Sequence, residues 1–188
     1  DKFGYDYRID VNKANAWSTY TAEFYNMKAM LSGRIGYTGM NRRGYMRNGM
    51  APNNSQSKSG TANFLDGGVK GSLNVDMGRG HAFSIGAGYE LRAPMANTAF
   101  ISPEISNDFV TNLKNERIFS SEFSYQYRNA WLSANVSGYY SRLENVTEWQ
   151  NFYNDDENSF TYVSMTGLKK EYYGVEVGAK FKLTSWLD

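Results

Sequence analysis

The clearest signal of fold in this chain is the stretch YGVEVGAKFKLT, residues 173–184. Successive side chains of a β-strand point to opposite faces of a sheet, so an alternating sequence predicts a strand with two unlike faces. The even-numbered positions here are glycine or polar. The stretch is also longer than the usual strand of about 5–6 residues. Its apolar positions are Tyr173, Val175, Val177, Ala179, Phe181 and Leu183.

The same alternation recurs along the rest of the chain and predicts about seven strands. The weakest of the other segments is the first, where Ala16, Tyr20 and Phe24 mark one face and Trp17 and Glu23 the other. No apolar run approaches the roughly 20 residues of a membrane helix. The other predicted strands cover residues 16–24, 29–38, 65–76, 83–92, 119–128 and 131–141.

The connections between these strands alternate in length. Short connections occupy residues 26–28, 78–81 and 128–130. The other connections, residues 44–60, 94–115 and 154–159, are longer and polar. Short turns on one side and long loops on the other are typical of outer-membrane β-barrels, in which the long loops are extracellular. We therefore expect an all-β, antiparallel transmembrane sheet in the outer membrane, with these three loops outside the cell.

Aromatic residues lie near both ends of the predicted strands. Aromatics make up 16% of the chain, mainly as 15 Tyr and 11 Phe. Amphipathic rings prefer the headgroup level of a membrane and form girdles on barrels. We expect one girdle at Tyr25, Tyr127, Trp131 and Trp186, and the other at Tyr89, Tyr139, Tyr140, Tyr172 and Tyr173.

The composition excludes several classes of function. The chain has no cysteine and one histidine, so it offers few ligands for a thiolate or histidine metal site. Its 20 basic and 19 acidic residues balance, which gives no indication of nucleic acid as a partner. No nucleophile and base can be assembled from the sequence, and the Gly86-Ala87-Gly88 run lies within a strand. We therefore expect neither an enzyme nor a bound cofactor.

Several short motifs together resemble the barrel of TonB-dependent outer-membrane receptors. They are YELRAP at 89–94 followed by FISPE at 100–104, NERI at 115–118 followed by Ser121-Glu122, and YGVE at 173–176. Trp17 and the run RGYMRNG at 43–49 look like the Bacteroidetes branch of the family, whose plug is preceded by a carboxypeptidase-regulatory-like domain. Each motif alone is weak, but their order fits the predicted strands and loops.

This resemblance implies a larger molecule than a seven-stranded sheet. The receptors that this chain resembles consist of a TonB box, a plug domain and a barrel of about 22 strands. Residues 1–188 are then expected to be a single late segment of the barrel, without plug, TonB box or final strands. The implied function is active uptake of a ligand. The implied partners are the missing strands and plug, the TonB complex acting through that plug, and a surface lipoprotein.

Candidate ligand-binding residues lie in the predicted extracellular loops. Arg42, Arg43 and Arg47 form a basic cluster that suits lipopolysaccharide phosphates or an anionic ligand, or equally lumenal ion pairs with Glu90 or Glu104. The acidic run at 155–158 suits calcium or a solvated loop tip. Trp149, Phe152 and Tyr153 suit a ligand vestibule or the upper girdle. The predicted ligand-binding set is Arg42, Arg43, Arg47, Trp149, Tyr153, Asp155 and Asp156.

Two other architectures remain open at this point. A small structural or adhesin barrel without transport requires an eighth strand and a closed ladder of hydrogen bonds. A soluble β-sheet binding protein requires Val175, Val177, Phe181 and Leu183 to pack against a second sheet. Burial of these four side chains therefore distinguishes the soluble architecture from the membrane one.

Overall fold

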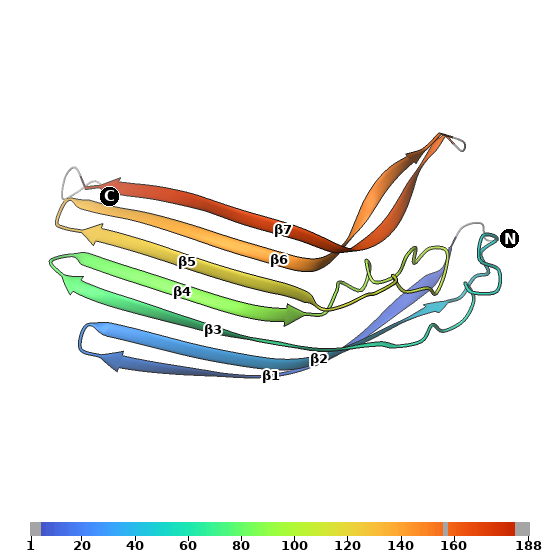
Figure 1. Ribbon diagram of the computed structural model, residues 1–188, viewed down its shortest axis with the longest axis horizontal. Helices are drawn as coiled ribbons and strands as arrows, with labels where there is room; N and C mark the ends of the chain where they lie inside the picture. The colour runs from blue at the N-terminus through green and yellow to red at the C-terminus, as the bar shows by residue number, and fades with distance from the viewer. Residues whose placement is uncertain (1–4, 156–157, 183–188) are drawn as a thin grey trace.

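The computed structural model describes residues 5–155 and 158–182, and they form one antiparallel sheet of seven strands in sequential order (Figure 1). This confirms the predicted all-β class. The predicted connections 44–60, 94–115 and 154–159 fall between strands β2 and β3, β4 and β5, and β6 and β7. The strands are β1 (Tyr7–Phe24), β2 (Met27–Gly44), β3 (Ala62–Gly78), β4 (His81–Arg92), β5 (Glu116–Arg128), β6 (Leu132–Asn154) and β7 (Ser159–Phe181).

The three short turns lie at one end of the sheet, which we call the turn end (Figure 1). The β3–β4 turn uses backbone angles that favour glycine, with φ of 74° at Gly78 and 83° at Gly80. A side chain at Gly80 would also meet the carbonyl oxygen of Arg128, only 1.7 Å from the position of its Cβ. The turn therefore lies against the end of β5, where the Arg128 amide donates to the Gly80 carbonyl.

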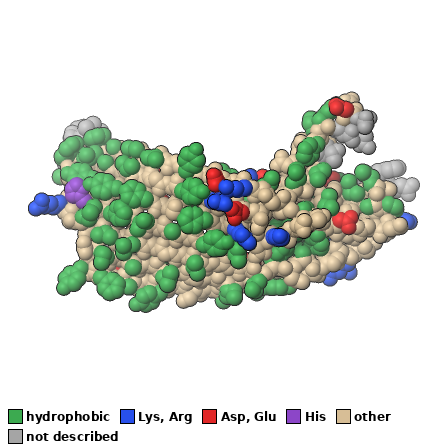
Figure 2. Space-filling view, in the orientation of Figure 1, with side chains coloured by type: hydrophobic (Ala, Val, Ile, Leu, Met, Phe, Trp, Pro, Cys, Tyr) green, Lys and Arg blue, Asp and Glu red, His purple; other side chains and the backbone are tan. Residues whose placement is uncertain are grey.

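One face of the sheet, which we call the outer face, is apolar and exposed. It carries the odd-numbered residues of β7, of which Val175 and Val177 are 74% and 75% exposed. Phe181 is also exposed, and Leu183 lies outside the described residues. Within the described part of the chain, Val175, Val177 and Phe181 pack against no second sheet, which is not the burial that the soluble architecture requires. Figure 2 shows this face, with apolar side chains covering the turn end.

The register extends the outer face across every strand. Val177 lies opposite Val136, and Val136 opposite Tyr125, which continues the row across β6 and β5. In β1 the same face carries Tyr20 and Phe24, as the sequence predicted. A transmembrane strand needs about 9–11 residues, which matches the apolar part of each strand. No helix long and apolar enough to cross a membrane occurs among the described residues.

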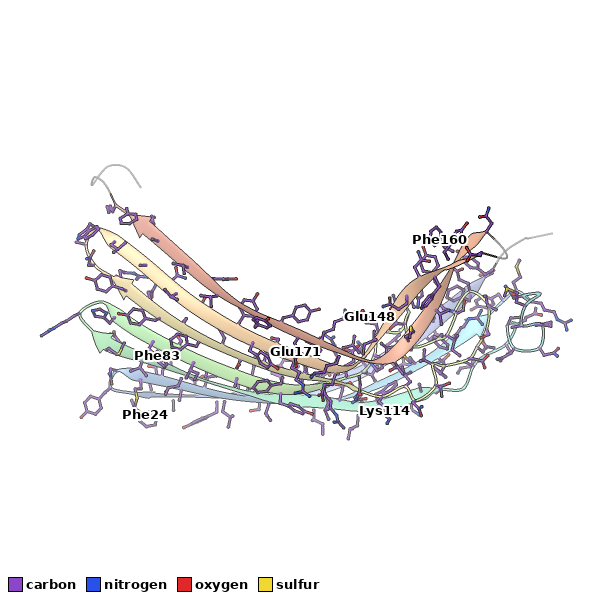
Figure 3. The ribbon with its side chains drawn as sticks, turned by 45° about the horizontal axis from the view of Figure 1, so that its top comes forward. Phe24, Phe83, Lys114, Glu148, Phe160 and Glu171 are labelled. Carbon is purple, nitrogen blue, oxygen red and sulfur yellow. The ribbon has the colours of Figure 1, made fainter. Side chains whose placement is uncertain are left out.

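The opposite face, which we call the inner face, is polar and concave. It carries the even-numbered residues of β7, with Glu176 opposite Ser137. Glu122 of β5 lies on the same face, opposite Tyr139. Figure 3 shows the sheet curved like a section of a cylinder wall. The main cluster of buried apolar side chains lies at the end of the sheet that carries the long loops, where Met40 and Phe64 pack with Ala99 and Phe100 of the β4–β5 loop.

Strands β6 and β7 are longer than the sequence analysis predicted. They continue as a paired ribbon, which we call the arm (residues 147–166), beyond the level where β4 and β5 end (Figure 1). The pairing shifts register between Leu143 and Glu148. Such bulges bend a strand and increase its twist. The prediction missed this continuation because the bulges interrupt the simple alternation of the sequence.

We expect a substitution at Gly167 to affect the arm and no other part of the sheet. Its φ is +84°, a conformation that costs a β-branched residue about 1–3 kcal/mol. Gly167→Val should therefore speed hydrogen exchange in residues 147–166 and leave the turn end unchanged. The matched control is Gly71→Val on the outer face of β3, where an added Cβ meets only ordinary contacts, at 3.5 Å from the Met30 carbonyl oxygen. Equal exchange in both variants would contradict a role for the Gly167 backbone conformation in holding the arm.

Candidate functional site

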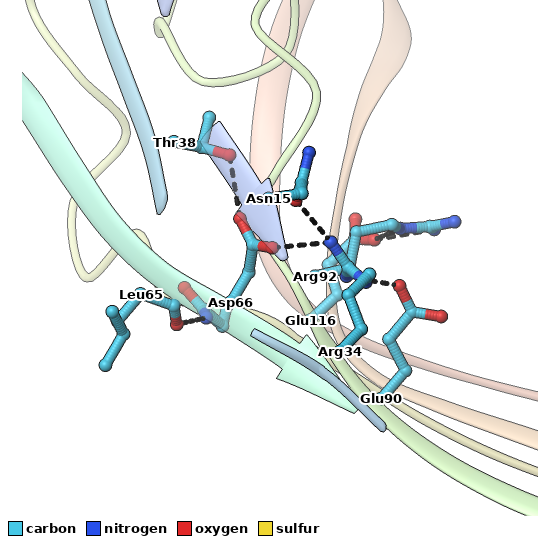
Figure 4. A network of polar contacts seen from close by, with 9 residues as sticks. Asn15, Arg34, Thr38, Leu65, Asp66, Glu90, Arg92 and Glu116 are labelled. Carbon is cyan, nitrogen blue, oxygen red and sulfur yellow. Dashed lines mark hydrogen bonds and ion pairs between the residues drawn. The ribbon is translucent and has the colours of Figure 1, made fainter. Parts of the chain in front are cut away.

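A network of ion pairs crosses the inner face from β1 to β4, and we call it the inner-face network (Asn15, Arg34, Thr38, Asp66 and Glu90; Figure 4). Arg34 of β2 lies at its centre. Its Nη1 donates to Asp66 Oδ1 on β3 at 2.8 Å and to Asn15 Oδ1 on β1 at 2.9 Å. Its Nη2 donates to Glu90 Oε1 on β4 at 2.8 Å. The network therefore ties four neighbouring strands together through one guanidinium.

The strand register explains why these side chains meet. Gly68 lies directly opposite both Arg34 and Glu90, so no side chain separates the two charged groups. At Gly36, a Cβ would lie 2.4 Å from both Asn15 Oδ1 and Asp66 Oδ1. Glycines at these positions leave the space that the network occupies.

Asp66 is the most buried charge of the network. Its side chain is 5% exposed, against 32% for Arg34 and 44% for Glu90. Its second oxygen, Oδ2, accepts a hydrogen bond from the Thr38 hydroxyl at 2.7 Å. A buried carboxylate whose two oxygens each accept a hydrogen bond restricts the rotamers of its donors. A second pair, Arg92 with the buried carboxylate of Glu116, lies alongside it between β4 and β5.

Removal of the Asp66 carboxylate should loosen this part of the wall. Asp66→Ala leaves the Thr38 hydroxyl without its acceptor and removes one of the two acceptors of Arg34 Nη1, at a cost of about 1–3 kcal/mol because Arg34 is partly exposed. We expect a lower guanidinium midpoint for unfolding of the whole protein in detergent. Asp66→Asn, which keeps an acceptor of the same size, should recover part of the loss. Unchanged midpoints in both variants would contradict a structural role for the network.

Below the network, towards the turn end, small side chains leave a hollow of about 750 Å³ in the inner face. Its floor consists of glycine and serine from β2 to β6, and its margin carries longer side chains. The margin includes Trp17, which is 75% exposed. The polar and charged residues that line the hollow include Ser32, Arg34, Lys70, Glu90, Ser120 and Glu122.

The long loops 45–61 and 93–115 pack on each other at the opposite end of β2, and we call them the loop cap. Arg42, 1% exposed, lies within it. Its Nε donates to the Pro103 carbonyl at 2.7 Å, and its Nη1 donates to the Ser55 carbonyl at 2.9 Å and to Asn107 Oδ1 at 2.6 Å. Burial lowers the pKa of the Arg42 guanidinium, and the nearby Tyr7, whose ring lies 5.1 Å away, opposes this shift.

The three predicted arginines therefore lie in different surroundings. Arg42 is engaged by the protein itself, and Glu90, one of its two expected partners, pairs with Arg34 instead. Arg43 is exposed, and its backbone forms a bridge with Lys58. Arg47 is exposed and donates to the Pro52 carbonyl at 2.9 Å. That these residues bind a ligand stays a prediction.

The predicted aromatic residues lie in the arm and not in a loop. Trp149, Tyr153, Phe160 and Tyr162 share one face of the ribbon, since Tyr153 is opposite Phe160 and Asn151 is opposite Tyr162. Ring centroids lie 6.3 Å apart for Trp149 and Tyr162, and 5.2 Å apart for Tyr153 and Phe160. Asp155 is exposed at the tip of the arm, and Asp156 lies outside the described residues.

The inner-face network was not predicted from the sequence. From the sequence, Arg34 and Asp66 were assigned only to the polar faces of their strands, and Glu90 was considered as a partner of the basic cluster Arg42, Arg43 and Arg47. These ion pairs could have been predicted from one feature of the sequence, since the three charged residues lie on the polar faces of neighbouring strands. Among residues 5–155 and 158–182, no three acidic or histidine side chains come together as a metal site.

Comparisons with known proteins bear on the fold. No family model matches the chain, and no curated protein matches it by sequence. Among solved structures, the chain is similar to the copper transporter OprC, with a TM-score of 0.76 at 17% sequence identity. The match covers 94% of this chain and 27% of the transporter. The chain thus has the fold of a section of an outer-membrane β-barrel wall and spans about a quarter of the length of that protein.

Proposed function

We propose that this chain forms part of the wall of a TonB-dependent outer-membrane transporter, lining the path of a ligand and contributing extracellular loops. The observation that carries the proposal is the two-faced sheet, whose exposed apolar outer face suits lipid and whose charged inner face suits a lumen. The sheet supplies wall, loops and lumen lining. It carries out no chemistry of its own in this proposal.

The open edges of the sheet support a larger barrel. Strands β1 and β7 are its two edges, and within the described residues they do not pair with each other. Unpaired backbone groups in lipid cost several kcal/mol each, so a transmembrane sheet must close. Further strands from the same protein would close it. A small adhesin-type barrel, the second candidate, would instead close through one added strand between β1 and β7.

In this proposal a plug domain packs against the inner face. The hollow of small residues admits a packed domain, and Lys70, Glu122 and Glu176 offer charges that face the lumen. The resemblance to TonB-dependent receptors implies a plug domain, on which the TonB complex would pull. A surface lipoprotein partner, implied by the Bacteroidetes-type motifs, is part of the same proposal.

Ligand capture is proposed for the arm and the exposed loop residues. The aromatic row of Trp149, Tyr153, Phe160 and Tyr162 is exposed and stands beyond the apolar part of the sheet. This position favours a vestibule over a membrane girdle. Arg43, Arg47 and Asp155 are exposed at the same end of the strands and belong to the proposed set.

The copper of the structural neighbour is not carried over to this chain. The chain has no cysteine, and its single histidine, His81, lies at the turn end, where its Nδ1 is 2.6 Å from the Tyr125 hydroxyl.

A photo-crosslinking experiment on the whole protein tests the proposed plug. A benzophenone side chain at Ser120 on the inner face should join residues 1–188 to another segment of the same polypeptide, identified by mass spectrometry. The same group at Val177 on the outer face should give lipid adducts only. Lipid adducts or no product from Ser120 would contradict a plug at the inner face.

A further inference from the structure

A cluster of charged side chains lies on the outer face, above its apolar part, and we call it the outer charge cluster (Arg117, Arg142, Glu144, Lys169 and Glu171). Lys169 Nζ lies 3.0 Å from Glu171 Oε1, and Arg142 pairs with Glu144. The register places these residues on one face, since Arg117 is opposite Glu144 and Arg142 is opposite Glu171. Three cations meet two carboxylates, so the cluster keeps a net positive charge.

Arg117 is the cation that has no carboxylate of its own. It is exposed, and among residues 5–155 and 158–182 it forms no ion pair. The side chains of Arg142 and Lys169 are also about half exposed, so all three cations are open to a ligand. Figure 2 shows basic and acidic side chains gathered near the middle of the outer face, beyond the apolar zone.

The level of the cluster relative to the membrane follows from strand length. Arg142 lies ten residues along β6 from Leu132, the first residue after the turn. At about 3.3 Å per residue and a tilt of about 45°, ten residues rise roughly 23 Å. The apolar band of a barrel is about 25 Å tall. The cluster therefore lies at the headgroup level of the leaflet on the side of the long loops.

A groove of about 450 Å³ lies directly below the cluster on the same face. Gly138 lies in its floor, and its walls include Phe123, Tyr140, Tyr173 and Val175. The Tyr140 hydroxyl donates to Glu171 at 3.3 Å, which links the top of the groove to the cluster. An apolar groove that ends in cations matches a lipid with a phosphorylated headgroup and acyl chains.

We propose that this surface binds one lipopolysaccharide molecule of the outer leaflet, with its lipid A phosphates on the outer charge cluster and one acyl chain in the groove. The inference rests on the proposed orientation of the barrel, in which the long loops are extracellular. Arginine binds phosphate through charge-assisted, often bidentate hydrogen bonds. Glu144 and Glu171 hold Arg142 and Lys169 in place before binding.

The groove and the cluster favour this lipid over a phospholipid. A glycerophospholipid has one headgroup phosphate, whereas lipid A carries two phosphates on a wide disaccharide. The cations are spread over β5, β6 and β7, because Arg117, Arg142 and Lys169 lie on three different strands. A headgroup with phosphates at both ends spans neighbouring strands better than a single phosphate does.

The test uses the whole protein in detergent with purified lipid A as the probe and native mass spectrometry as the readout. The wild-type protein should retain one lipid A molecule. The Arg117→Ser, Arg142→Ser and Lys169→Ser triple variant should bind it at least about tenfold more weakly, given the usual contribution of a basic side chain at an anionic membrane surface. A matched triple variant, Lys70→Ser, Lys180→Ser and Arg79→Ser, removes the same charge from the inner face and the turn end. It should bind as the wild type does.

A second variant tests the groove without touching the charges. Gly138→Trp fills the groove and should lower lipid A retention, whereas Ala134→Trp on the same face of β6, outside the groove, should not. Equal retention by the cluster variant and the wild type would overturn the proposal, as would equal competition by phosphatidylglycerol. The Ser120 crosslink reports on the plug independently. A positive crosslink with no lipid A retention would therefore remove only this inference and leave the proposed function standing.

Discussion

Replacing Arg42 by alanine should loosen both long loops of the loop cap at once. The substitution removes the donors to the Pro103 and Ser55 carbonyls and to Asn107 Oδ1, and leaves these buried acceptors unsatisfied. The expected cost is about 3 kcal/mol, since each buried unsatisfied group costs about 1–3 kcal/mol and water can reach some of them. Hydrogen exchange in residues 45–61 and 93–115 should accelerate by roughly a hundredfold.

The neighbouring arginine provides the control for this prediction. Arg43 is exposed, and its side chain forms no hydrogen bond or ion pair with the described residues of the loop cap, so Arg43→Ala should leave exchange in both loops unchanged. An Arg42→Ala protein with wild-type exchange would show that apolar packing around Phe100 and Phe109, whose rings stack at 4.4 Å, holds the cap without the arginine.

A charge placed on the outer face should destabilise the protein strongly. Val177 is 75% exposed and lies near the middle of the apolar part of β7. If this face meets lipid, Val177→Arg should lower the free energy of unfolding by about 2–4 kcal/mol. The measurement is the guanidinium unfolding transition of the whole protein in lipid vesicles.

The same charge on the inner face gives the matched control. Ser137 of β6 faces inward, opposite Glu176 of β7, so Ser137→Arg adds a cation beside an existing carboxylate. Its effect should stay within about 1 kcal/mol, as for surface ion pairs. Equal destabilisation by both substitutions would contradict the assignment of the two faces.

The strands and their two faces could be predicted from the sequence because both follow from local alternation. Residues 173–181 show this, since Val175 and Val177 are exposed on one face and Glu176 lies on the other. Even the weakest segment obeyed the rule, with Tyr20 and Trp17 on opposite faces. Among the described residues no second layer covers the sheet to override the pattern, so the local signal survives folding.

The site could be predicted only in part, because its contacts join residues far apart in the chain. Arg42 bonds to Pro103 and Asn107 through the packing of two loops whose conformation no periodic pattern describes. Arg34 meets Glu90 because β2, β3 and β4 are in register across Gly68. The arm was missed for a local reason, since bulges between Leu143 and Glu148 break the alternation.

Residue-by-residue accessibility along β7 tests the central claim most directly. Spin labels placed one at a time from 173 to 180 in the whole protein, reconstituted in lipid vesicles, report collisions with oxygen in lipid and with a water-soluble nickel complex. Labels at 173, 175, 177 and 179 should collide mainly with oxygen, and labels at 174, 176, 178 and 180 mainly with the nickel complex or with neither. Alternating accessibility, with the odd-numbered positions exposed to oxygen in lipid, would support a transmembrane wall with lipid on the outer face. High nickel accessibility at all eight positions would contradict it.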